Sequence, residues 1–164
     1  MVSSSVLQEN LETAGRLIHA AAQDGSHLIV LPEYFCMMGL KDTDKVRIRE
    51  SISGGPIQER LAGFAKENAI HLIAGTIPLE TQEPGKVLNS ILAFNPEGQQ
   101  IGRYDKIHLF GFQTKTERYQ ESETIEAGSA PSILKIAHHN QEWTFGLSVC
   151  YRSEEHTSEL QSRE

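Results

Sequence analysis

A chain of 164 residues with 38% hydrophobic and 23% charged residues is long enough to bury one core as a single globular domain. Its formal net charge of −7, with no cluster of Lys and Arg among aromatic residues, argues against a nucleic-acid surface. Apolar runs such as residues 28–31 are far too short to cross a membrane, so we expect no membrane partner.

The start of the chain and its two cysteines indicate a compartment. Residues 1–5 contain no basic segment followed by an apolar one, so we predict no secretory signal. Cys36 and Cys150 could pair in principle, but without an export signal we expect reduced thiols. The sequence therefore predicts a cytoplasmic protein.

The first part of the chain predicts an amphipathic helix followed by a short buried strand. Residues 5–24 carry apolar side chains at spacings of three and four, which is typical of one helix face. Ser5 with Gln8 resembles a capping box, and Gly25 is a natural stop. Residues 27–31, which include the apolar run 28–31, predict a buried strand, which ends at a proline.

A second helix and a second strand complete a repeating unit. Gly54-Gly55-Pro56 predicts a helix start, and residues 70–74 predict another buried strand. The helix should direct four side chains inward: Ile57, Leu61, Phe64 and Ala65. The order strand, helix, strand favours a right-handed βαβ unit with parallel neighbours.

The rest of the chain predicts hairpins. Pairs of apolar segments flank turn-forming residues: 87–94 with 100–104 around 95–98, and 132–137 with 143–150 around 138–141. A parallel unit combined with hairpins predicts an α/β fold with a mixed sheet.

Both ends of the chain look cut. No strand precedes the first helix, although a βαβ layout usually supplies one. Residues 152–164 show neither an apolar stripe nor alternation, and residues 152–162 resemble the translation of a widely used sequencing-adapter oligonucleotide. We therefore expect residues 1–151 to be the natural part of the domain and residues 152–164 to be a non-native disordered tail.

Three predicted strands are each followed by one reactive side chain: Glu33, Lys106 and Cys150. A thiol with an ordinary pKa near ~8.5 is only a few per cent thiolate at neutral pH, so it needs a base or a positive neighbour. Glu33 is partly desolvated where a strand meets a loop, so it could accept the thiol proton. Lys106 could stabilise the thiolate and a later oxyanion. Together the three predict acyl transfer.

The histidines are weaker candidates. Cysteine hydrolases often use a histidine base, and the chain has 7 histidines. His138 and His139 belong to a predicted turn, where polar residues need no further reason. His108 follows Lys106 by two positions, so both side chains would leave the same face of an extended segment. We expect His108 to orient a neighbour rather than to act as the base.

Three segments resemble the nitrilase (carbon–nitrogen hydrolase) superfamily: Leu31-Pro32-Glu33, Arg103-Tyr104-Asp105-Lys106-Ile107-His108-Leu109 and Gly146-Leu147-Ser148-Val149-Cys150-Tyr151. The resemblance implies that Glu33 is the general base, Lys106 the oxyanion stabiliser and Cys150 the nucleophile. It also implies that the backbone N–H of Tyr151 contributes to the oxyanion hole. Glu121 matches a second glutamate that positions the substrate and the lysine, although Glu123 and Glu126 are close by.

The resemblance extends to substrate and fold. Pro32-Glu33-Tyr34-Phe35 and the segment 106–110 look most like ω-amidases and deaminated-glutathione amidases, which hydrolyse the terminal amide of a small carboxylate and release ammonia. Nitrilases acting on nitriles share the same residues. The family fold is an α-β-β-α sandwich, and its full-length members are expected to form homodimers or larger homo-oligomers.

The sequence departs from the family after its cysteine. There the family pattern continues Cys-Tyr-Asp-Leu-Arg-Phe-Pro, whereas Arg152 begins the foreign tail here. We therefore expect an incomplete sandwich that leaves the inner face of its sheet bare. A chain of this kind should be inactive and prone to aggregate, because the lost burial would exceed an ordinary net stability of ~5–15 kcal/mol.

Two non-amidase hypotheses compete with this interpretation. A thiol redox protein would use Cys150 with Cys36 as its resolving partner, but the sequence has no Cys-x-x-Cys motif. A nonenzymatic remnant of the fold could persist as a binding module. We predict no cofactor and no metal, because His138-His139 is not a metal-ligand spacing and no Gly-rich phosphate loop is present.

Overall fold

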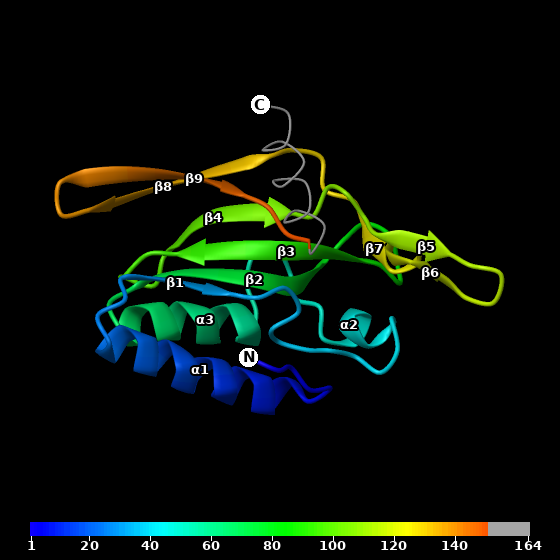
Figure 1. Ribbon diagram of the computed structural model, residues 1–164, viewed down its shortest axis with the longest axis horizontal. Coiled ribbons are helices and arrows are strands. Elements are labelled where there is room, and N and C mark those ends of the chain that lie inside the picture. The colour runs from blue at the N-terminus through cyan, green and yellow to red at the C-terminus, as the bar shows by residue number, and fades with distance from the viewer. Residues whose placement is uncertain (151–164) are drawn as a thin grey trace.

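The computed structural model describes residues 1–150 as three stacked layers, shown in Figure 1. Two long helices cover one face of a five-stranded sheet, and a β-hairpin covers the other face. The helices are α1 (Leu7–Gln23), α2 (Asp44–Arg47), α3 (Pro56–Glu67) and the 3₁₀ helix η1 (Glu121–Glu123). The strands are β1 (Leu28–Leu31), β2 (His71–Glu80), β3 (Val87–Phe94), β4 (Gln100–Asp105), β5 (Gly111–Gln113), β6 (Arg118–Gln120), β7 (Ile125–Glu126), β8 (Ser132–His138) and β9 (Gln141–Leu147).

Helix α1 forms where its apolar spacing predicts, but a different residue organises its start. The expected capping box of Ser5 and Gln8 is wrong, because Val6 is the N-cap residue and makes no side-chain cap bond. Instead, Asn10 is buried and its side chain binds both the backbone N–H and the C=O of Ser4, at 2.8 and 2.7 Å. The predicted stop is confirmed: Gly25 has φ +89°, and the chain turns away after it.

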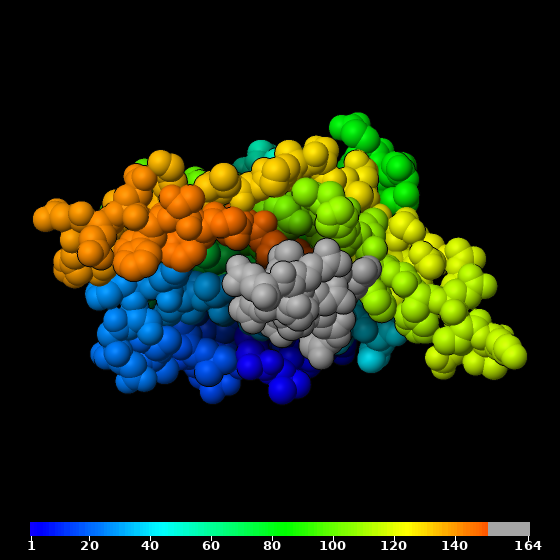
Figure 2. Space-filling view, turned by 45° about the horizontal axis from the view of Figure 1, so that its top comes forward, coloured from blue at the N-terminus to red at the C-terminus, as the bar shows by residue number. Residues whose placement is uncertain are grey.

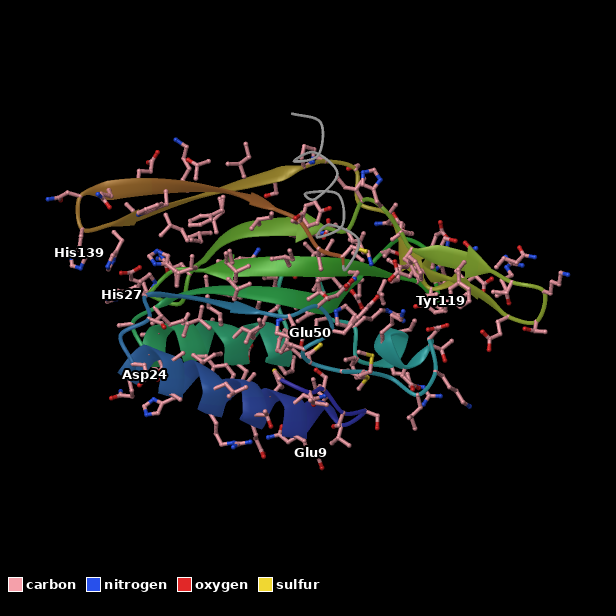
Figure 3. All side chains as sticks on the ribbon, in the orientation of Figure 1. Glu9, Asp24, His27, Glu50, Tyr119 and His139 are labelled. Carbon is pink, nitrogen blue, oxygen red and sulfur yellow. The ribbon has the colours of Figure 1, made fainter. Side chains whose placement is uncertain are left out.

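Helix α3 begins at Pro56, as predicted, and its N-terminus is capped by a carboxylate from outside the helix. Glu50 (labelled in Figure 3) is buried and accepts hydrogen bonds from the backbone N–H of Ile57 and of Gln58, the latter at 3.1 Å. A negative charge is favourable here because the helix dipole is positive at its N-terminus. The four predicted inward residues are all buried: Ile57, Leu61, Phe64 and Ala65.

The central sheet is mixed, in the order β1-β2-β3-β4, and β7 pairs with β3. The parallel pairing of β1 with β2 confirms the predicted strand–helix–strand unit. The antiparallel pairing of β3 with both β2 and β4 gives β4 the same direction as β1. One expectation is wrong: β1 is an edge strand, in which Val30 is 62% exposed and only Leu31 is buried.

Both predicted hairpins are present. The β3–β4 turn is held by Asn95, whose side-chain oxygen accepts from the N–H of Gln99 at 2.8 Å, and Gly98 supplies a φ of +78°. In the β8–β9 turn, His139 and Asn140 both have positive φ, 46° and 62°. Strand β9 ends at Leu147, so the expectation of a strand running directly to Cys150 is wrong.

The inner face of the sheet is covered, which corrects the expectation of a bare face. Apolar side chains from the sheet and from the β8–β9 hairpin form one buried cluster: Ile73, Ile91, Ala93, Tyr104, Leu134, Ile136 and Leu147. Burying a side chain such as Leu or Ile stabilises the fold by about 1.5–3 kcal/mol. A larger cluster fills the space between the sheet and the helices. Within residues 1–150, no helix is both long and apolar enough to pass through a membrane.

Candidate active site

The sheet topology brings four chain segments together at one end of the strands. Strands β1 and β4 run in the same direction, so Glu33 after β1 and Lys106 after β4 emerge at the same end. Strand β3 runs the opposite way and begins there, which places Asn89 near that end. Because β7 pairs in parallel with the start of β3, the preceding η1 delivers Glu121 to the same place.

Lys106 lies at the centre of this site. Its side chain is 2% exposed, and its Nζ lies 3.0 Å from Glu33 Oε1 and 2.9 Å from the carboxylate of Glu121. Its backbone is fixed as well, since its N–H donates to the C=O of Asn89 and its C=O accepts from the N–H of Gly128, at 3.0 and 2.9 Å. The ammonium is therefore held between two carboxylates that are distant in sequence.

Glu121 is the most deeply buried of the acidic groups at this end of the strands. It is 4% exposed, and besides Lys106 it accepts from the backbone N–H of Phe110 at 2.7 Å and from the hydroxyl of Tyr34 at 3.1 Å. The neighbouring Glu123 instead points outward and pairs with an exposed arginine. The structure therefore places Glu121, and not Glu123, against Lys106.

Glu33 keeps some contact with solvent. Its side chain is 22% exposed, and its Oε1 accepts from the side-chain amide of Asn89 at 2.8 Å as well as from Lys106. Asn89 is 3% exposed in strand β3, whose other polar residue is Ser90. Sequence reasoning missed Asn89, although an amide and a serine inside an apolar run were a usable signal. It also missed Tyr34, which directly follows Glu33.

The charges at the site perturb two pKa values. Burial acts to lower the pKa of Lys106, but hydrogen bonds and attraction from Glu121 and Glu33 outweigh it, so the pKa is raised. The lysine is therefore a fixed positive charge at neutral pH. Burial raises the pKa of Tyr34, and the nearby carboxylates of Glu121 and Glu33 raise it further. Tyr34 therefore stays a neutral hydrogen-bond donor.

Cys150 follows β9 by three residues and is half-buried. Its neighbour Val149 packs against the same apolar cluster as Ile107, the residue after Lys106. In Figure 1 the chain beyond β9, drawn in red, descends from the hairpin towards the sheet. Tyr151, with its proposed oxyanion N–H, and the tail 152–164 lie outside the described residues.

Three other residues considered from the sequence have different surroundings. Cys36 is 2% exposed, its thiol donates to the C=O of Thr76 at 3.5 Å, and burial raises its pKa to about 12. It is poorly suited to resolve a disulfide, because the thiolate is the reactive form. His108 is exposed, and β4 ends before it, so the extended segment assumed for it is absent. His139 lies in the β8–β9 turn.

The geometry defines a chemical capability. A carboxylate with solvent contact can exchange a proton, a buried ammonium can stabilise developing negative charge, and a second carboxylate holds that ammonium in place. A half-buried thiol after the covering hairpin is a side chain that could serve as a nucleophile. Acyl transfer by a cysteine hydrolase is the chemistry that these residue types can perform on an α/β fold.

Comparison with known proteins shows the family to which the chain belongs. A family model described as carbon–nitrogen hydrolase matches residues 3–158, so the chain belongs to the carbon–nitrogen hydrolase family. The omega-amidase NIT2 of Xenopus tropicalis is 37% identical over 150 residues, which cover 90% of this chain and 51% of that protein. The deaminated glutathione amidase of Synechocystis sp. (strain PCC 6803 / GT-S) is 33% identical over 153 residues, covering 92% and 55%.

Solved structures agree on the fold. The Caenorhabditis elegans NitFhit protein superposes with a TM-score of 0.75 at 25% identity over 94% of this chain and 37% of that one. Saccharomyces cerevisiae Nit3, of branch 10 of the nitrilase superfamily, gives 0.74 at 26% identity over 93% and 53%. The fold is thus the nitrilase-type α-β-β-α sandwich, of which residues 1–150 form the layers described above. The chain spans about half the length of the curated relatives it matches.

Proposed function

We propose that Glu33, Lys106, Glu121 and Cys150 are the catalytic machinery of an amidase that acts on a small-molecule amide. The observation that carries the proposal is the buried Lys106 ammonium, which lies 2.9–3.0 Å from two carboxylates at the carboxyl ends of β1 and β4. A buried cation with two anionic partners costs desolvation energy, and replacing such a group by apolar side chains is often neutral or stabilising. Its presence is therefore better explained by chemistry than by stability.

The proposed reaction has two halves. Glu33 removes the thiol proton of Cys150 as the sulfur attacks the amide carbon, and the same proton passes to the departing nitrogen, which leaves as ammonia. The thioester is then attacked by water, whose proton Glu33 accepts and returns to the sulfur as the carboxylic acid leaves. In both halves Lys106 and the backbone N–H of Tyr151 stabilise the oxyanion, which forms and collapses at the former carbonyl oxygen.

Glu121 acts by positioning. It binds Lys106, Tyr34 and the backbone of Phe110 together, so it fixes the lysine relative to the loop that follows β4. A misplacement of about 1 Å in such a group can cost roughly 100-fold in rate. Glu121 is thus a positioning residue for Lys106 and also for Tyr34, the residue that follows Glu33.

The substrate class is proposed from the relatives and from one further cation. Relatives are named omega-amidase and deaminated glutathione amidase, and we propose a terminal amide of a small carboxylate as the substrate. Lys45 supports this choice: its Nζ lies 5.6 Å from the ring centroid of Tyr34, and it lines a cavity of about 70 Å³ with Tyr34 and Tyr119. Burial lowers the pKa of Lys45, and its attraction to Asp42 and Glu121 opposes that shift. A substrate carboxylate would find a positive partner there.

The activity is proposed for a protein of the relatives' length, which we expect to be a homodimer or a larger homo-oligomer. The 164-residue chain alone is expected to be inactive, since it spans about half of each relative. No metal or cofactor takes part in the proposed reaction.

The test is ammonia release from small amides by a form of the protein that spans the relatives' length. Terminal amides of small dicarboxylic acids should be hydrolysed, Cys150→Ala should abolish the activity, and Cys36→Ala should retain it. Hydrolysis of nitriles but not amides would replace the proposal with a nitrilase. Activity that survives Cys150→Ala would overturn the thiol mechanism.

A further inference from the structure

Three histidines from two distant parts of the sequence meet at the other end of strand β1. His27 directly precedes β1, His138 is the last residue of β8, and His139 begins the hairpin turn. Ring centroids lie 4.2 Å apart for His27 and His138, 4.0 Å for His138 and His139, and 6.0 Å for His27 and His139. Figure 3 labels His27 and His139, which lie at the same end of the molecule, away from the carboxyl ends of β1 and β4.

The fold dictates this meeting. Side chains two apart on a strand share a face, and Leu134 and Ile136 of β8 are buried in the cluster against the sheet. His138 is next in that series, so it too faces the sheet at its rim. His27 is anchored there because its C=O accepts from the N–H of His71 at 2.9 Å. Figure 2 shows the same arrangement, with the orange hairpin resting along the blue residues of the first part of the chain.

One imidazole nitrogen in the cluster needs a partner. His138 Nε2 is buried and has no hydrogen-bond partner among the described residues. Leaving a buried polar group unsatisfied is unfavourable, which is why buried polar groups in native proteins usually have partners. The cavity beside His27 and His138, of about 170 Å³, offers few polar groups as partners. Its other lining residues are Leu28, Ile136, Trp143, Phe145 and His71.

We propose that His27, His138 and His139 form a binding site for a divalent transition-metal ion of the zinc class, which joins the β8–β9 hairpin to the start of β1. One ligand atom from each residue lies within 4.8 Å of the other two. Nitrogens bound to one tetrahedral zinc at ~2.1 Å lie roughly 3.4 Å apart, so the three must approach by at most about 1.4 Å. His27 and His139 are exposed and can rotate to make that approach.

The chemistry of the ligands selects the ion. Imidazole nitrogens suit zinc, copper and nickel, whereas calcium and magnesium prefer oxygen ligands. Three protein ligands leave a fourth position for water. Strand β1 separates this site from Glu33, so the ion is assigned a structural role: it fastens the hairpin whose second strand leads to Cys150. Sequence spacing could not show the site, because His27 lies far from the adjacent pair His138 and His139.

The test is zinc binding to the untagged 164-residue chain, freed of metal beforehand and titrated with zinc chloride against a chromophoric chelator. The chain should bind one zinc ion, and His27→Ala should weaken binding by more than about 10-fold. His139→Asn should do the same; asparagine tolerates the positive φ at that position, so the turn is kept. His19→Ala is the matched control, since His19 is exposed on α1 and hydrogen-bonds Asn68.

Cobalt provides a second, spectroscopic measurement. Cobalt(II) in the same chain should give visible absorption bands typical of a tetrahedral site, and both cluster variants should lose them. The control variant should keep both zinc affinity and the cobalt spectrum. Zinc binding that persists unchanged in His27→Ala and His139→Asn, or a wild-type chain that fails to compete with the chelator, would overturn the proposal. Neither measurement depends on enzymatic activity.

Discussion

Replacing Glu121 by glutamine should destabilise the fold far more than the same change two residues away. Glu121 is 4% exposed and accepts from Lys106 Nζ at 2.9 Å, the Phe110 N–H at 2.7 Å and the Tyr34 hydroxyl at 3.1 Å. Glutamine keeps the shape of the side chain but loses its charge. Its amide group has one acceptor oxygen where the carboxylate has two. Among the residues that the structure describes, Glu33 would remain as a carboxylate partner of Lys106.

The magnitude follows from the number and kind of bonds affected. Each hydrogen bond to a charged group contributes about 1.5–3 kcal/mol, and removing one partner of a buried ion pair costs about 3–5 kcal/mol. Because Glu33 still partners the lysine, we expect Glu121→Gln to lower the free energy of unfolding by about 2–4 kcal/mol. With a urea m-value of about 2 kcal/mol/M, the midpoint should fall by about 1–2 M.

The assay is urea unfolding followed by the fluorescence of Trp143, the single tryptophan of the chain. Glu123→Gln is the matched control, because its side chain is 64% exposed and pairs with Arg118 at 3.2 Å. Exposed pairs contribute little, so the control should change stability by less than about 1 kcal/mol. Equal losses in the two variants, or a loss below about 1 kcal/mol in Glu121→Gln, would refute the account of the buried ion pairs.

Three further predictions concern pH, thiol reactivity and backbone packing. Because the folded state raises the pKa of Tyr34, the unfolded chain alone releases that proton above pH ~10, and stability should fall by up to about 1.4 kcal/mol per pH unit. Lys106, whose pKa is also raised, contributes its full stabilisation below pH ~10.4 and loses it at higher pH. In urea titrations from pH 9 to 11, Tyr34→Phe should therefore reduce, but not remove, the fall of the free energy of unfolding with pH. A thiol reagent should modify Cys150 in the native chain and Cys36 only after unfolding, because Cys36 is 2% exposed with a pKa of about 12; equal rates for both thiols, measured by mass spectrometry, would contradict this. Gly128→Ala should destabilise the fold by several kcal/mol, because its Cβ would clash with the backbone oxygen of Asp105, whereas Gly146→Ala has open space and should shift the thermal midpoint little.

Local pattern was sufficient for most of the elements. The apolar spacing of α1 and α3, the proline at the start of α3 and the turn residues of both hairpins all act over a few positions, so the sequence displays them directly. The mixed sheet and the parallel β1–β2 pair followed from the order of those elements. The start of α1 did not, because its organising bonds come from the side chain of Asn10 to the backbone of Ser4 rather than from Ser5.

Tertiary packing decided the features that sequence reasoning missed. The exposure of β1 depends on its place at the edge of the sheet, and the covered inner face depends on where the β8–β9 hairpin folds. In the site, the motifs identified Glu33, Lys106 and Glu121, but only the fold shows that both carboxylates bind the same ammonium. Asn89 and Tyr34 join them through contacts between strands and loops distant in sequence.

The central claim is that Cys150 forms an acyl-thioester with the help of Glu33 and Lys106. The most direct measurement is mass spectrometry of a form of the protein spanning the relatives' length, quenched in acid during turnover of a small terminal amide. The account predicts an added acyl mass on the peptide that contains Cys150, unchanged in Cys36→Ala, absent in Cys150→Ala and formed at least about 100-fold more slowly in Glu33→Gln. Ammonia release with no adduct at Cys150, or an adduct that forms equally fast in Glu33→Gln, would contradict it.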